Sequence, residues 1–66
     1  MTVCLNGVQS DTRGAETVAE LAERYGLERN SILIEHNGIA LHPREWAGCA
    51  LAEADRVEFI RVVAGG

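Results

Sequence analysis

The chain has 66 residues, enough for one small domain that buries about 60% of the surface its unfolded form exposes. Six arginines against ten acidic residues give a net charge of −4, so the positive footprint that nucleic-acid binding needs is absent. Hydrophobic residues form 47% of the chain, too many for a disordered protein, yet no apolar run approaches a membrane span. We therefore expect a globular domain without nucleic-acid or membrane partners.

The two cysteines, Cys4 and Cys49, are too few for the disulfide framework of a small extracellular domain. They are also too isolated from His36 and His42 to predict a zinc site, so no metal is expected. The first residues lack a basic segment followed by an apolar stretch, so we expect no secretory signal. We expect both thiols to pack as small hydrophobic groups in the cytoplasm, with a persulfide on either as the less favoured alternative.

Two Asn-Gly dipeptides predict two tight hairpins, because this pair tolerates the positive φ angles of a two-residue turn. Asn6-Gly7 joins predicted strands at 3–5 and 8–10. Asn37-Gly38 joins a predicted strand at 31–35, which we expect to be mostly buried, to a predicted strand at 39–41. Pro43 ends the second hairpin, since proline cannot donate to a β-ladder.

One amphipathic helix is expected to begin at Thr17 and to stop at Gly26. Thr17 and Glu20 have the spacing of a capping box, in which each side chain satisfies a free backbone N–H group. The apolar stripe that should face the core consists of Val18, Leu21, Ala22 and Tyr25. The acids around this helix should form a solvated face.

The segment from Arg44 to Ala54 contains Gly48 and predicts only a short helical turn or an irregular crossing. Residues 56–63 predict the last strand, with Val57 and Phe59 on one face and Glu58, Ile60 and Val62 on the other.

With one helix to cover one face of a single mixed sheet, the order of elements favours an α+β, ubiquitin-like β-grasp fold. In this fold the last strand lies centrally beside the first. We expect one domain over residues 1–66, with a flexible tail at 63–66.

The sequence Val63-Ala64-Gly65-Gly66 is the candidate functional segment. Glycines lack Cβ atoms, so the pair can thread a narrow channel, and residues 63–66 reach about 13 Å when extended. The Gly66 carboxylate becomes an electrophile only after activation, for example adenylation by ATP. The isolated glycines elsewhere form no phosphate-binding loop, so we expect no bound cofactor and place ATP and the catalytic groups on a partner.

Over essentially its whole length, the sequence resembles the ThiS family, the sulfur carrier proteins of thiazole biosynthesis. The features that carry the resemblance are Leu5-Asn6-Gly7, Thr17-Val18 with Leu21, Asn37-Gly38, Pro43-Arg44-Glu45-Trp46, residues 55–60 and the final Val63-Ala64-Gly65-Gly66. The family commonly has Gly-Asp before its last strand, whereas this chain has Ala54-Asp55. Ala54 is therefore expected at a turn position that favours glycine.

The resemblance implies a protein substrate rather than an enzyme. An E1-like adenylyltransferase would activate Gly66 with ATP, a cysteine desulfurase relay would supply sulfur, and thiazole synthase would receive it from a C-terminal thiocarboxylate.

Several other residues have two interpretations. Ile60 and Val62, with Val63 and Ala64 beside them, could dock the activating enzyme, or could be covered by loops or be scattered surface residues. Trp46 is expected to cover the core. His36 and His42 are expected at the surface without a catalytic partner.

Three functions remain open from sequence. The first is a sulfur carrier for thiazole formation, and the second is a carrier or subunit for molybdopterin, cysteine or a secondary metabolite. The third is a ubiquitin-like modifier, which could not form self-linked chains because the sequence contains no lysine. A plain interaction domain is the residual alternative.

Overall fold

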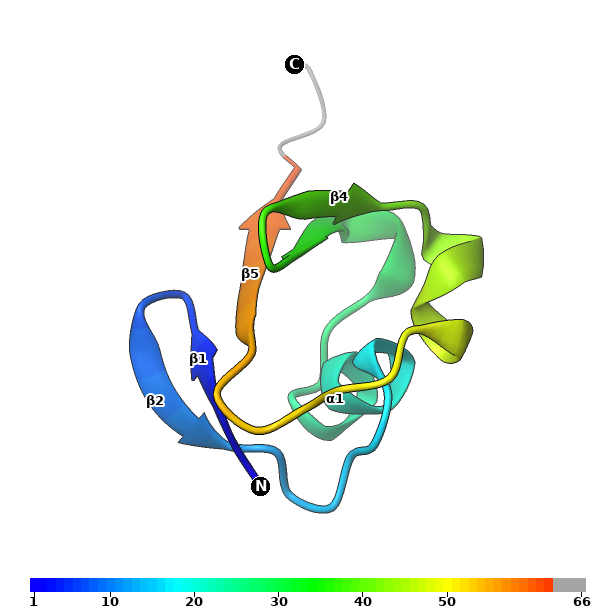
Figure 1. Ribbon diagram of the computed structural model, residues 1–66. Helices are drawn as coiled ribbons and strands as arrows, with labels where there is room; N and C mark the ends of the chain where they lie inside the picture. Colours follow the sequence, from blue (N-terminus) through cyan, green and yellow to red (C-terminus); the bar gives the residue numbers. More distant parts are fainter. Residues whose placement is uncertain (63–66) are drawn as a thin grey trace.

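The computed structural model describes residues 1–62 and shows a five-stranded mixed sheet with one α-helix on one face (Figure 1). The strands are β1 (Thr2–Leu5), β2 (Val8–Asp11), β3 (Ile32–His36), β4 (Ile39–Leu41) and β5 (Arg56–Arg61). The helical elements are α1 (Val18–Arg24) and two 3-10 turns, η1 (Arg29–Ser31) and η2 (Pro43–Gly48). Within the described residues no helix is long and apolar enough to cross a bilayer.

The order of the strands in the sheet is β2-β1-β5-β3-β4. β1 runs parallel to β5, and the remaining neighbours are antiparallel. The last strand therefore lies in the centre beside the first, which confirms the predicted β-grasp arrangement.

Both Asn-Gly hairpins form as predicted. The φ angles are 50° and 82° at Asn6 and Gly7, and 50° and 86° at Asn37 and Gly38. In each turn the two central residues thus adopt the left-handed conformation that sets a two-residue connection.

The helix begins and ends close to the predicted residues. The Glu20 N–H donates to Thr17 Oγ1 at 3.2 Å, and the Glu20 carboxylate accepts the N–H of Glu16 at 2.8 Å, one residue before the usual position. At the other end Gly26 has a φ of 67°. Its N–H and that of Leu27 reach back to carbonyls in the last turn, which forms a Schellman cap.

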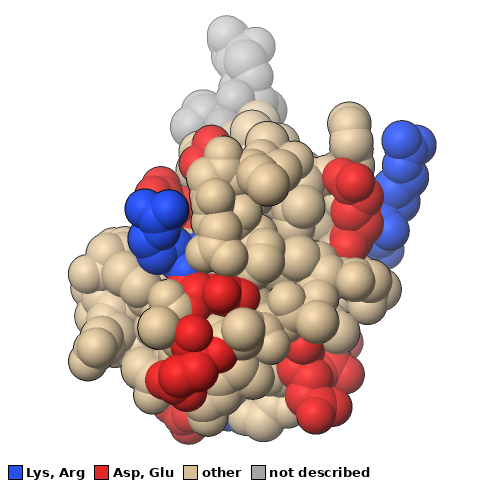
Figure 2. All heavy atoms as spheres, in the orientation of Figure 1, with Lys and Arg blue, Asp and Glu red and all other residues tan. Residues whose placement is uncertain are grey.

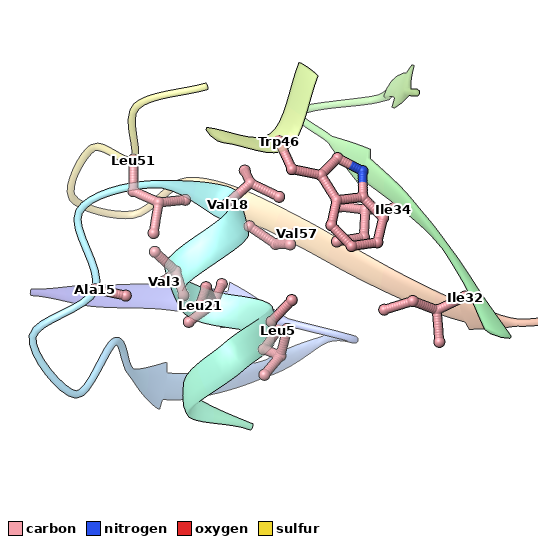
Figure 3. Packing of buried hydrophobic residues seen from close by; sticks show 11 residues of the cluster. Val3, Leu5, Ala15, Val18, Leu21, Ile32, Ile34, Trp46, Leu51 and Val57 are labelled. Carbon is pink, nitrogen blue, oxygen red and sulfur yellow. The ribbon is translucent and has the colours of Figure 1, made fainter. Parts of the chain in front are cut away.

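The core lies between α1 and the inner face of the sheet (Figure 3). Its most deeply buried side chains are Val3, Val18, Leu21, Ile34 and Val57. Trp46 enters the core from η2 and is only 3% exposed, so the prediction that it covers the core is confirmed. Because inward and outward residues alternate along a strand, these positions decide which side chains remain on the outer face.

The segment before β5 is a short helical turn followed by an irregular crossing, as predicted. η2 ends at Gly48, and the chain then passes α1, where the Val18 N–H donates to the Cys49 carbonyl at 2.9 Å. Ala54 adopts a φ of 70°, so it does occupy a position that favours glycine.

Candidate functional site

The outer face of β5 carries the two predicted docking residues that the structure describes. Val57 is fully buried and Phe59 packs against the core, whereas Ile60 and Val62 are 40% and 46% exposed. The predicted division of β5 into two faces is thus correct. The other predicted site residues, Val63, Ala64, Gly65 and Gly66, lie outside the described residues.

Leu33 joins this surface from the neighbouring strand. It pairs with Ile60 in the antiparallel register of β3 and β5, and it is 52% exposed. The N–H of Val62 donates to the Ser31 carbonyl at 2.8 Å, so the chain stays beside β3 after β5 ends. We call Leu33, Ile60 and Val62 the outer-face patch.

Sequence analysis did not single out Leu33, because the strand at 31–35 was expected to be mostly buried. The burial along β3 alternates instead, with Ile32 and Ile34 inside and Leu33 outside. A position between two buried residues of a strand is the signal that could have identified it.

Two carboxylates lie next to the outer-face patch. Glu35 pairs directly with Glu58, one outward position along from Leu33 and Ile60. Like charges directly opposite each other in a sheet repel, so this pair favours an arriving cationic group. Figure 2 shows acidic side chains at several positions on one face of the molecule, with basic side chains toward the sides of the view.

A second group of functional side chains forms where the β3–β4 turn meets the start of β5. His36 Nε2 lies 2.7 Å from Asp55 Oδ2, and His36 Nδ1 lies 3.4 Å from Cys49 Sγ. The side chains of His36 and Asp55 are 17% and 13% exposed, and Cys49 is half-buried. We call these three residues the thiol cluster.

The thiol cluster corrects two sequence expectations. His36 is not a surface residue without a partner, and Cys49 is not isolated from it. The misjudgement arose because strand pairing and the irregular crossing bring together residues separated by 13 and 19 positions. The other histidine, His42, is exposed as expected.

Hydrogen bonds decide the charge state of Asp55. Burial would raise the pKa of this carboxyl, but bonds from His36, the Ala52 N–H and the Asn37 amide outweigh it and hold the pKa below its ordinary value. The last two bonds measure 2.9 and 3.2 Å. Asp55 is therefore a carboxylate at neutral pH and can only accept hydrogen bonds.

The pKa of the Cys49 thiol is shifted in the opposite direction, above its ordinary value. Burial is the main reason why its pKa is raised, and the negative charges of Asp55 and Glu45 add to the effect. The thiol is therefore protonated at neutral pH.

The asparagines of both hairpin turns also bind the backbone of β5. Asn37 Oδ1 accepts the N–H of Arg56 at 2.8 Å, and Asn6 Oδ1 accepts the N–H of Phe59 at 2.8 Å. The central strand, from which the chain continues to residue 63, is thus attached to both turns.

A model of the ThiS family matches residues 3–66. The chain belongs to the ThiS family. No curated protein gives a match. Among solved structures, it is similar to the crystal structure of the thiamine biosynthesis protein ThiS from Geobacter metallireducens, with 29% sequence identity, full coverage of both chains and a TM-score of 0.81. Both findings agree with the resemblance and the fold derived from the sequence.

Proposed function

We propose that this chain is a sulfur carrier of thiamine biosynthesis, acted on by other enzymes and catalysing no turnover of its own. Membership of the ThiS family and full-length similarity to a thiamine biosynthesis protein support this role. The observation that carries the proposal is that the family match extends through Gly65 and Gly66.

The proposed chemistry takes place at the carboxylate of Gly66. An E1-like adenylyltransferase binds ATP, and the carboxylate attacks the α-phosphorus and releases pyrophosphate. The outer sulfur of a protein persulfide, supplied from cysteine by a desulfurase relay, then displaces AMP and forms an acyl disulfide. A second thiol of the partner cleaves the S–S bond of this acyl disulfide, which leaves a thiocarboxylate on Gly66 and a disulfide on the partner. Thiazole synthase takes up this sulfur. The chain itself binds no cofactor in this scheme, because the partner consumes the ATP.

The activating enzyme is proposed to dock on the outer-face patch. The exposed side chains of Leu33, Ile60 and Val62 offer an apolar contact at the end of β5, and Val63 and Ala64 would extend it toward the active site. The Glu35 and Glu58 carboxylates beside the patch favour a partner surface with basic side chains at its edge. Gly65 and Gly66 then allow the partner backbone to approach closely.

The cytoplasm is the proposed location. Cys4 and Cys49 are both free thiols, which suits a reducing compartment.

The decisive test is the intact mass of the protein, purified from its own host without thiol-reactive reagents. We expect a species in which one oxygen is replaced by sulfur, and we expect it to be absent from a variant lacking Gly66. The proposal is wrong if the mass remains unmodified when an E1-like enzyme, ATP, cysteine and a desulfurase are supplied together.

A further inference from the structure

The contacts within the thiol cluster define which ring nitrogen of a neutral His36 carries the proton. Because the Asp55 carboxylate only accepts hydrogen bonds, the 2.7 Å contact requires the proton on Nε2 of the neutral imidazole. Nδ1 is then an unprotonated acceptor. The thiol 3.4 Å away can donate its proton to that nitrogen. Cysteine, histidine and aspartate thus stand in the sequence of contacts used by nucleophile–base–carboxylate relays.

We propose that Cys49 is a nucleophile that accepts sulfur from a persulfide, with His36 as its proton acceptor and Asp55 as the positioning residue. Cys49 packs against the edge of the core but is only half-buried, which suits approach by a small persulfide or by an exposed persulfide group of a protein. The three groups form a chain of contacts and do not surround a common point, which distinguishes the arrangement from a metal site.

A sulfur electrophile suits this site better than a carbonyl. Acyl transfer develops an oxyanion that needs prearranged N–H donors, and the N–H of Cys49 is already bonded to the Trp46 carbonyl at 3.3 Å. Attack on an S–S bond needs only a thiolate and a proton for the departing thiol.

In the proposed step, Cys49 Sγ bonds to the outer sulfur of a donor persulfide, R–S–SH. The S–S bond of the donor breaks, and its electron pair leaves with the inner sulfur. His36 takes the thiol proton and returns it to that sulfur. The products are Cys49–S–SH and R–SH, so no separate oxidant or reductant is needed.

The surroundings of the thiol explain why a base is needed. Burial is the main effect that opposes formation of a thiolate on Cys49, and the negative charges of Asp55 and Glu45 oppose it further. Without His36 the thiol would react slowly near neutral pH, because only the thiolate attacks. Transfer of the proton to Nδ1 as the new bond forms avoids a free thiolate.

The test measures sulfur transfer from glutathione persulfide, resolved by peptide mass spectrometry after the remaining thiols are blocked. Cys4 is the internal control, because it lies on the outer face of β1 without a hydrogen-bonded histidine within residues 1–62. At neutral pH we expect Cys49 to gain sulfur faster than Cys4. In H36Q the rate at Cys49 should fall about 100-fold at neutral pH, and much of this loss should be recovered in alkaline solution, where the thiol ionises without a base.

D55N separates positioning from a merely structural role. The neutral asparagine can still accept from Nε2 and from the Ala52 N–H, but it lacks the negative charge that stabilises the imidazolium formed when His36 takes the thiol proton. We expect the same loss of rate at neutral pH and the same recovery in alkaline solution, while Cys4 reacts at its wild-type rate. Faster reaction of Cys4 would reveal unfolding of a variant, and the wild-type rates of the two cysteines would then decide.

The proposal is overturned if Cys49 reacts no faster than Cys4, or if its rate at neutral pH is unchanged in folded H36Q. A disulfide, oxidised glutathione, serves as the second probe. Selective reaction with the disulfide but not with the persulfide would also contradict sulfur acceptance. Gly66 plays no part in these measurements, and formation of the Gly66 thiocarboxylate is measured separately in C49S, so this proposal and the proposed carrier function can fail separately.

Discussion

The imidazole of His36 and the carboxylate of Asp55, 19 residues apart in the sequence, are joined by a hydrogen bond of 2.7 Å. The bond links the end of β3 to the residue that precedes β5. Asp55 also caps the loop through the N–H of Ala52 at 2.9 Å. One carboxylate therefore holds together three segments that converge at the entry to the central strand.

Stability should depend on pH through Asp55. Since its folded pKa lies below the unfolded value, its stabilising contribution is complete above the unfolded pKa and is lost as the pH falls through the folded pKa. D55N should lower the free energy of unfolding at pH 7 by about 1.5–3 kcal/mol, the range for hydrogen bonds to charged groups. Urea unfolding at several pH values measures this difference. A gap between wild type and D55N that stays constant into strongly acidic solution would contradict the assignment.

Ala54 should tolerate glycine with a gain in stability. Its φ of 70° costs an L-residue about 1–2 kcal/mol, and glycine would remove this strain. Part of the gain is offset because glycine has more conformational freedom to lose from the unfolded chain. We expect A54G to raise the free energy of unfolding by about 0.5–1 kcal/mol. The control is A40G, at an exposed position of β4 with an ordinary negative φ, which should instead be destabilising. Equal effects of the two substitutions would refute the explanation.

Asn37 combines a backbone and a side-chain role that two substitutions can separate. N37A loses both the tolerance of a φ of 50° and the side-chain bonds to Arg56 and Asp55. N37G keeps the turn and loses only the bonds. We expect N37A to be less stable than N37G by about 1 kcal/mol, and N37G to be less stable than the wild type. Thermal unfolding followed by circular dichroism gives the order, and N37G as stable as wild type would show that the bonds contribute nothing.

The outer-face patch should contribute to binding in addition to its part in folding. Ile60 and Leu33 are 40% and 52% exposed, so I60S and L33S remove side chains that are about half-buried, and each should lower the unfolding free energy by about 1–2 kcal/mol. Each should weaken binding of the activating enzyme about 5- to 30-fold, as expected for loss of 1–2 kcal/mol of apolar contact. Titration calorimetry measures the affinity.

The matched control for the patch is V8S. Val8 is 64% exposed but lies on the edge strand β2, opposite Leu5 and away from the patch. Its substitution should leave the affinity unchanged. A loss equal to that of I60S would place the contact elsewhere.

The local elements could be read from the sequence because each is encoded within a few residues. Asn6-Gly7 and Asn37-Gly38 specify their turns through positive φ angles, and Thr17 and Gly26 mark the ends of the helix. Alternation along residues 57–62 correctly placed Ile60 and Val62 on the outer face.

Contacts between distant elements required the tertiary structure. The register of β3 on β5 places Leu33 beside Ile60, and the path of the crossing after η2 places Cys49 beside His36. Local patterns determine the strands, the turns, the helix and hence the order of elements, since φ preferences and hydrophobic periodicity act over short stretches. Register and loop path depend on packing summed over the whole chain, so only the fold decided that Leu33 joins the outer-face patch and that the thiol cluster forms.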